Sequence, residues 1–225
     1  MAAALLPAAA PAATRGFSVT SFDRIRVEGP FAVTLRTGTG SSARADGPDR
    51  RALDDVRIET MGRTLVIRRD RSGTSSAPPK GVRIALTTPA VTGATVLGSG
   101  SLSVDAARGA RFDAAVSGAG ALTIARIDTD VLNVTVTGAG STKLDGATRQ
   151  LRAILQGAGT LDAPGLTAQD AVLTTAGTAT VTLTATRTAK INATGSGDVT
   201  ILGTPACTVA STGTVEVTCT GPARR

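Results

Sequence analysis

Apolar and polar residues alternate along most of this chain, and a glycine pair interrupts the alternation at regular intervals. Apolar residues at every second position place one face of a strand inward and the other outward. The alternation is clear before one glycine pair, at Leu132, Val134 and Val136, and after another, at Leu122 and Ile124. The pattern predicts short β-strands on both sides of each glycine pair.

The glycine pairs belong to a Gly-x-Gly unit that recurs about every twenty residues. Five copies are complete, and in two others we interpret the first glycine as replaced. The second glycine then falls at Gly100, Gly120, Gly140, Gly159, Gly177, Gly197 and Gly213. A fixed period of this length is typical of solenoids, whose repeats pack only on their neighbours. Because glycine permits a sharp bend, each unit is expected to be a strand, a glycine corner and a second strand.

We therefore predict an all-β protein with a right-handed parallel β-helix of about 20 residues per coil over residues 81–225. Residues 15–80 should form an N-terminal β-strand segment, antiparallel or mixed, that caps the solenoid, because an open end exposes unpaired strand edges. One helical turn is expected at residues 52–55 and a loop at residues 71–80, which are rich in Ser and Pro. Residues 1–14 are interpreted as a signal peptide remnant or a disordered tail.

The composition limits both the core and the partners. The chain has no Trp or Tyr and four Phe, so aliphatic side chains must fill the interior. The net charge of +7 favours acidic partners. Basic residues are nevertheless mixed with acidic ones, and no aromatic platform accompanies them for base stacking, so we expect no nucleic acid partner. No run of roughly 20 apolar residues is present, and no transmembrane span is predicted.

Residues 1–14 combine small apolar residues with Ala-x-Ala-like steps, as in the cleavage region of a secretory signal peptide, although a basic n-region is missing. We therefore expect an exported protein in the periplasm, at the cell surface or in the medium. In such a protein Cys207 and Cys219 are disulfide candidates, and two buried free thiols are the alternative if export is wrong. Two thiols without any His do not favour a zinc site, and no metal or cofactor is predicted.

Known catalytic arrangements find little support. Without His, Ser-His-Asp and Cys-His arrangements are impossible within this chain. The Gly-x-Gly units lack the third glycine and the helix of a dinucleotide-binding loop, so they are interpreted as structural. Carboxylates on neighbouring coils could cleave polysaccharide, but Asp105 and Asp145 are expected two coils apart. A second expected ladder, containing Asp162, Lys143 and Glu216, also lacks an acidic cluster. No catalytic residue is assigned.

Alternate threonines, including Thr135 and Thr137, are similar to the rows of ice-binding solenoids. Equivalent positions hold Ala115, Asn192 and Gln156, which interrupt the rows. Threonine also suits the solvent side of any strand, and we favour that interpretation.

One segment resembles the start of the bacterial head-GIN-domain family, namely FDRIRVEGPFAV at residues 22–33. The strand at residues 62–67 and the tandem Gly-Ser-Gly or Gly-Ala-Gly corners also resemble that family. The family is a domain of unknown function whose members are labelled auto-transporter adhesins, and the resemblance extends over nearly all of residues 17–220. It implies an exported β-helical domain of the cell envelope. It implies no reaction and no active-site residues.

The sequence therefore favours a non-enzymatic envelope protein whose rigid β-helical surface serves binding, adhesion or structure, with an envelope polysaccharide or another protein as partner. The alternative is a polysaccharide-active β-helix enzyme, a lyase or glycosidase that uses surface carboxylates. An enzyme should cluster charged residues on one outer face, whereas a binding solenoid should not. Pairing between solenoid edges of two copies is a further route to a homo-oligomer.

Overall fold

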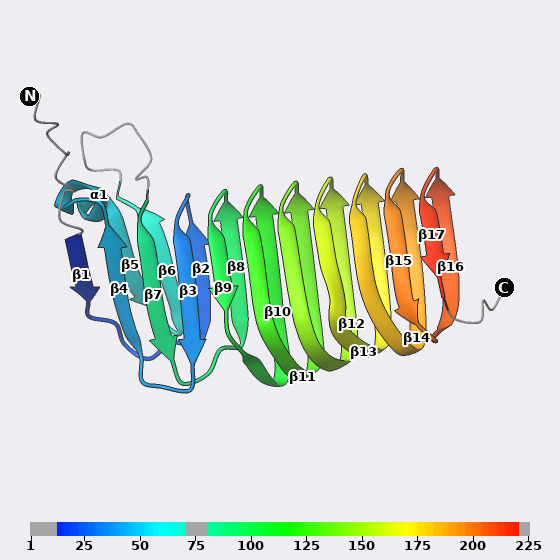
Figure 1. Cartoon of the computed structure of the whole chain (residues 1–225), viewed down its shortest axis with the longest axis horizontal. Helices are drawn as coiled ribbons and strands as arrows, with labels where there is room; N and C mark the ends of the chain where they lie inside the picture. Colours follow the sequence, from blue (N-terminus) through cyan, green and yellow to red (C-terminus); the bar gives the residue numbers. More distant parts are fainter. Residues whose placement is uncertain (1–12, 71–80, 221–225) are drawn as a thin grey trace, which may run out of the picture.

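The solenoid predicted from the repeat is the architecture found in the computed structural model (Figure 1). The structure describes residues 13–70 and 81–220. Strands make up 75% of the chain and helix 3%, and the strands wind into a β-solenoid of about 6 turns with roughly 20 residues per turn. Residues 1–12 of the predicted tail and the predicted loop at residues 71–80 lie outside the described residues. No helix in the described part of the chain is both long and apolar enough to cross a membrane.

The coils from residue 93 onward form two parallel sheets that face each other (Figure 1). The pre-corner sheet contains the strand segments that precede each glycine corner: β8 (Gly93–Gly98), β10 (Ala107–Gly118), the second halves of β11 (Ala121–Gly138), β12 (Ser141–Gly157), β13 (Thr160–Gly177) and β14 (Thr180–Gly195), and β16 (Ala206–Gly213). The post-corner sheet contains the segments that follow each corner: β9 (Ser101–Val104), the first halves of β11 to β14, β15 (Asp198–Gly203) and β17 (Glu216–Cys219). Each of the long strands β11 to β14 thus runs from one corner to the next and bends between the sheets.

At the glycine corners successive coils approach each other closely. The first glycine of each corner has a positive φ, as in Gly118 (+107°) and Gly138 (+103°), a conformation that favours glycine. The second glycine is required by space. A Cβ atom at Gly140 would lie 2.5 Å from Val116 Cγ1 and 2.9 Å from the Gly120 carbonyl oxygen. Both positions are therefore structural.

One detail of the predicted repeat is wrong. Gly177 and Gly213 are first glycines of their corners, because they pair in register with other first glycines and have φ values of +117° and +102°. The replaced residues in these two corners are therefore the second ones, at Ala179 and Val215. Only the first position demands a backbone conformation that favours glycine, so glycine is kept there while the second position varies.

The first strands do not stack in sequence order. β2 (Arg24–Glu28) pairs in parallel with β6 (Thr64–Arg69) on one side and with β8 on the other. β3 (Ala32–Thr37) pairs in parallel with β7 (Arg83–Thr88) and with β9. The coil formed by β2 and β3 therefore lies between the β6–β7 coil and the β8–β9 coil. Its inward side chains, such as Ile25, are buried and continue the core of the later coils.

Antiparallel pairs complete the N-terminal end. β1 (Ala13–Phe17) pairs with β4 (Ser42–Gly47), β4 pairs with β7, and β5 (Val56–Met61) pairs with β6. β1 begins with the last two residues of the predicted tail. The predicted helical turn is present as α1 (Arg50–Asp54) between β4 and β5, with Asp49 capping its N-terminus through a side-chain hydrogen bond.

The space between the two sheets is filled by ladders of aliphatic side chains, as the composition predicts. In one ladder Leu102, Leu122, Thr142 and Leu161 occupy equivalent positions on successive coils, and all four are fully buried. Thr142 is the one polar residue of this ladder, and its buried Oγ1 atom has no hydrogen-bond partner among the described residues. A buried hydroxyl without a partner costs stability, so Thr142 is a weak point of the core.

Candidate binding surface

In the last five coils, the three outward positions of the pre-corner sheet that precede each glycine corner form a ladder of mostly small polar side chains, which we call the open face. Every second residue of each strand points outward, and the parallel register aligns equivalent positions of successive coils. Its members are Asn133, Thr135, Thr137, Arg152, Ile154, Gln156, Val172, Thr174, Ala176, Lys190, Asn192, Thr194, Thr208, Ala210 and Thr212. The open face therefore spans five consecutive coils of one sheet.

The charge of the open face comes from two cations. Arg152 and Lys190 occupy the same register position on alternate coils, with Val172 between them. Both side chains are exposed, and among residues 13–70 and 81–220 neither has an ion-pair partner. Among the open-face residues named above there is no Asp or Glu, but Asp170 holds the next outward position along β13 from Val172, and Asp113 on β10 pairs in register with Asn133. Neither Arg152 nor Lys190 forms an ion pair with these two acids, whose described ion pairs are with Arg187, Arg24 and Arg111.

Two acids, Asp113 and Asp170, border the open face, and both already accept hydrogen bonds from neighbouring side chains. Asp113 accepts a hydrogen bond from Asn133 Nδ2 at 2.8 Å. Partial burial raises the pKa of Asp113, but hydrogen bonds, led by that of Asn133, outweigh it and hold the pKa below its ordinary value. Asp170, at the turn end of its strand, accepts hydrogen bonds from Arg187 and from Thr188 Oγ1. These two bonds lower the pKa of Asp170 to about 2.

Apolar side chains are exposed on the same sheet. Ile154 is 44% exposed and Val172 40%, and Val209, on β16, is also exposed at the C-terminal end. Ile154 and Val172 lie on adjacent strands, and Ile154 pairs in register with Thr174, two residues beyond Val172. Exposed apolar residues gathered at one place are typical of interaction surfaces.

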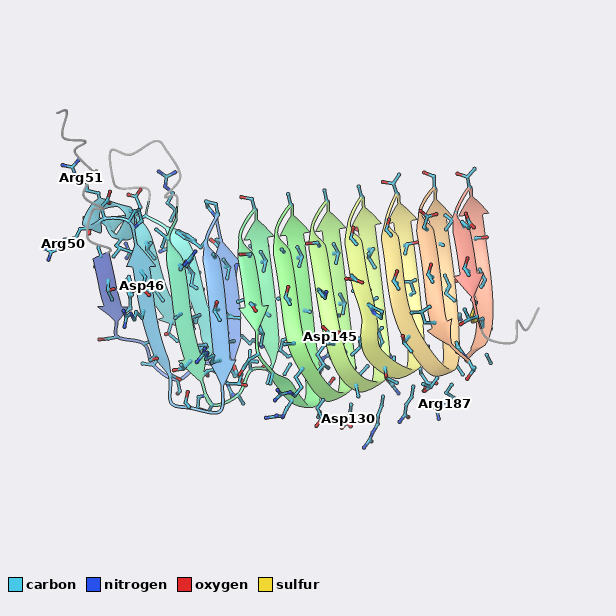
Figure 2. The ribbon with its side chains drawn as sticks, viewed as in Figure 1. Asp46, Arg50, Arg51, Asp130, Asp145 and Arg187 are labelled. Carbon is cyan, nitrogen blue, oxygen red and sulfur yellow. A yellow bond between two sulfur atoms is a disulfide. The ribbon has the colours of Figure 1, made fainter. Side chains whose placement is uncertain are left out.

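Paired charges lie along a different edge of the solenoid. Figure 2 shows Asp130 and Arg187 on the edge opposite the glycine corners, where the chain turns from one sheet to the other. Arg149 Nε lies 3.2 Å from Asp130 Oδ1, and Arg187 forms an ion pair with Asp170. These charges largely neutralise one another, in contrast to the cations of the open face.

The carboxylates considered for catalysis serve the scaffold. Asp105 Oδ1 accepts hydrogen bonds from the backbone nitrogen and the hydroxyl of Thr37, at 2.9 and 3.0 Å, and so ties its turn to β3. The carboxylate of Asp145 packs against Gly165 of the next coil, where no space remains for a Cβ atom. Each acid thus contacts a neighbouring coil.

The ladder expected for Asp162, Lys143 and Glu216 is wrong in one member. Lys143 and Asp162 do pair in register, with Nζ 3.8 Å from Oδ2. Glu216 instead pairs in register with Asp198. The error follows from the misassigned Gly213, which shifts the last coil by two positions.

A groove at the N-terminal end is a second candidate site. It has a volume of about 500 Å³, and its lining includes Glu28, Arg57, Arg68 and Asp70. Arg57 Nε lies 2.6 Å from Glu59 Oε1, and Arg68 Nη2 lies 2.9 Å from the other oxygen of the same carboxylate. Because these arginines already face a carboxylate, the groove offers less free charge than the open face.

Cys207 and Cys219 lie on the two strands of the last coil. The structure joins their sulfur atoms, with the two Cα atoms 6.8 Å apart. Cys207 is on β16 and Cys219 on β17, so the bond links the pre-corner and post-corner sheets at the C-terminal end of the described chain.

Neither Arg152 nor Lys190 stands out in the sequence. Their separation is close to two repeat lengths, which is the one signal that could have aligned them. Whether either cation has an acidic neighbour depends on the register of the coils on both sides, and the spacing of glycines does not supply it.

Fold and surface together define a rigid β-solenoid scaffold with a broad sheet face available for binding. The chain belongs to the family described as putative auto-transporter adhesin, head GIN domain, whose sequence pattern matches residues 21–205. This confirms the resemblance found in the sequence. No curated protein matches the chain.

Solved structures share the fold. A putative adhesin from Bacteroides fragilis aligns with a TM-score of 0.82 and 22% identity, covering 93% of this chain and 97% of the other. A putative lipid binding protein from Parabacteroides distasonis aligns with a TM-score of 0.74 and 17% identity, covering 92% and 96%. A putative adhesin from Parabacteroides merdae aligns with a TM-score of 0.71 and 14% identity, covering 92% and 95%. At these identities the comparisons establish the fold alone.

Proposed function

We propose that this chain is an exported cell-envelope protein that acts as a non-enzymatic adhesion module and binds its partner, an envelope polysaccharide or a protein, on the open face. The observation that carries the proposal is the combination of exposed Ile154 and Val172 with Arg152 and Lys190, which form no ion pair among the described residues. Binding surfaces tend to expose apolar side chains and arginine and to lack Asp and Glu. The description of the family as adhesins also supports a role in adhesion.

The scaffold suits such a role because it is rigid. Inward side chains on both sheets are buried in the coils before the last one, and backbone hydrogen bonds at the glycine corners hold each coil against its neighbour. A preorganised face loses little conformational entropy when it binds. The alternative of a polysaccharide-active enzyme gains no support from Asp105 and Asp145, since both contact neighbouring coils.

The test is a binding array of envelope polysaccharides and cell-wall polymers, probed at two salt concentrations with three proteins. These are the wild type, a Thr174→Trp variant and a Ser141→Trp variant. Thr174 lies in the middle of the open face, and Ser141 is an exposed outward residue of the opposite sheet. The same bulky neutral side chain is thereby added to each face.

We expect the wild type to bind at least one polymer, the Thr174→Trp variant to bind it weakly, and the Ser141→Trp variant to bind it as the wild type does. Equal loss in both variants, or loss only with Ser141→Trp, would show that the open face is not the binding surface. Circular dichroism spectra of all three proteins confirm that each is folded.

A further inference from the structure

The two cations of the open face lie at a spacing that the solenoid fixes. Successive strands of a sheet are about 4.8 Å apart, so equivalent positions on alternate coils are about 10 Å apart along the solenoid axis. Arg152 and Lys190 occupy such positions, one on β12 and one on β14. A ligand that meets both charges must therefore extend along the solenoid axis and carry negative groups at a matching interval.

The residues between and beside the cations specify the rest of the ligand. Val172 lies between them in the same register position, and Ile154 is exposed on the strand of Arg152. Asn192 and Thr174 add side chains that donate and accept hydrogen bonds along the neighbouring register position. The face therefore offers cations, a small apolar surface and hydrogen-bonding groups together.

Sugars with carboxylate or sulfate groups match this combination. A pyranose ring presents an apolar C–H face and hydroxyl groups at its rim, and acidic sugars add a negative group at a fixed position. The open face has no aromatic side chain, so ring stacking cannot provide the attraction that neutral sugars gain from aromatic residues. Charge must then provide a large part of the affinity, which favours an acidic polymer over a neutral one.

We propose that the open face binds an acidic polysaccharide that lies along the solenoid axis, with its negative groups at Arg152 and Lys190 and the C–H face of the intervening sugar on Val172. This inference rests on the proposed function and names its ligand class. One pyranose residue advances a polymer by about one coil spacing, so a polymer with an acidic group on every second sugar fits both cations.

The experiment measures the affinity of the full chain for three soluble polymers by isothermal titration calorimetry. Hyaluronan carries a carboxylate on every second sugar, polygalacturonate carries one on each sugar, and dextran carries none. We expect hyaluronan and polygalacturonate to bind with an affinity that falls as salt is added, and dextran not to bind. Binding of dextran as strong as that of the acidic polymers would overturn the proposal.

Charge variants locate the contact. Arg152→Gln and Lys190→Gln should each weaken binding about fivefold, the usual effect of one exposed charge contact. The double variant should weaken it about 25-fold, since side chains about 10 Å apart act independently. Arg126→Gln is the matched control, because Arg126 is an exposed residue on the turn edge with no ion-pair partner in the described part of the chain. Arg126→Gln should change the affinity for the acidic polymers only by the small amount expected when a charge that does not contact the polymer is removed.

The outcomes separate this inference from the proposed function. If Thr174→Trp abolishes binding of an array polymer while Arg152→Gln and Lys190→Gln leave it unchanged, the open face is the binding surface and the acidic-polymer proposal is wrong. If the array identifies only neutral polymers, and the charge variants bind them normally, the proposal is also wrong. If binding is lost equally in Arg126→Gln and the open-face variants, the attraction is nonspecific and the assigned contact is wrong.

Discussion

Thr142 offers a direct test of how the core of this solenoid is built. Its side chain occupies an inward position between Leu122 and Leu161 on the neighbouring coils, and its hydroxyl has no hydrogen-bond partner in the part of the chain that the structure describes. Valine has the same branched shape with a methyl group in place of the hydroxyl. Thr142→Val should therefore stabilise the protein, although most substitutions of buried residues destabilise.

The magnitude follows from the burial of that hydroxyl. Leaving a buried donor or acceptor unsatisfied costs about 1–3 kcal/mol. Thr142→Val replaces the hydroxyl by a methyl group of similar size and leaves the shape of the cavity unchanged. We therefore expect no steric strain to offset the stability gained by removing the unsatisfied hydroxyl. We expect the free energy of unfolding to rise by about 1 kcal/mol, which raises Tm by about 2–4 °C for a chain of this size.

The assay is urea unfolding followed by circular dichroism, with thermal melting as a second measurement. The matched control is Thr148→Val on the same coil. Thr148 is also buried, but its Oγ1 accepts a hydrogen bond from Thr129 at 3.3 Å and donates one to the Gln150 carbonyl oxygen at 3.2 Å. That variant should lose about 1 kcal/mol. The reasoning is refuted if Thr142→Val is no more stable than the wild type, or if both variants shift in the same direction.

Three further predictions concern the corners, the turn edge and the last coil. Gly140→Ala should lower the free energy of unfolding by about 1–3 kcal/mol because its Cβ would clash with adjacent coils. Gly40→Ala should leave it nearly unchanged in the same urea titration, because the added Cβ would meet no described atom within 4 Å beyond those of its chain neighbours. Asp170 has its pKa lowered from 3.8 to about 2 in the folded state, so it contributes stability above pH 3.8 that is lost as the pH falls towards 2. Asp170→Asn should therefore be less stable than the wild type at neutral pH and equally stable near pH 2 by circular dichroism. Reduction of the bond between Cys207 and Cys219, which are 12 residues apart, should lower stability by up to about 3 kcal/mol. Equal melting with and without reductant would contradict the presence of that bond in solution.

The sequence predicts the local features of this fold well because they leave local patterns. Leu122 and Ile124 point inward as their alternation predicts, and Gly118 and Gly138 form corners because glycine tolerates the positive φ that the bend requires. The stacking order of the first coils could not be predicted in this way. Ile25 would alternate identically whichever strand lay beside it, since the pattern specifies which face is buried and not which neighbour is adjacent.

The candidate site was harder to predict for a related reason. Whether a cation on a solenoid is free depends on which residues the adjacent coils place next to it. Coil lengths vary, and the misassignment of Gly213 by two positions was enough to move Glu216 from the ladder of Asp198 to that of Asp162. Arg152 and Lys190 became recognisable only when the register of all five coils was known.

The position of β2 and β3 has a consequence for how the molecule assembles. From β10 onward, each new coil can be added to the coil made just before it, in the order in which the chain is synthesised. The β2–β3 coil cannot be added in this way, because its partners on either side come from later parts of the chain: Arg24 lies opposite Thr64 on one side and Gly93 on the other. β2 and β3 must therefore remain without strand partners until β6 to β9 exist, and the junction between the N-terminal end and the regular coils closes around them. Loss of a C-terminal coil shortens the solenoid, whereas loss of the β2–β3 coil separates it into two parts.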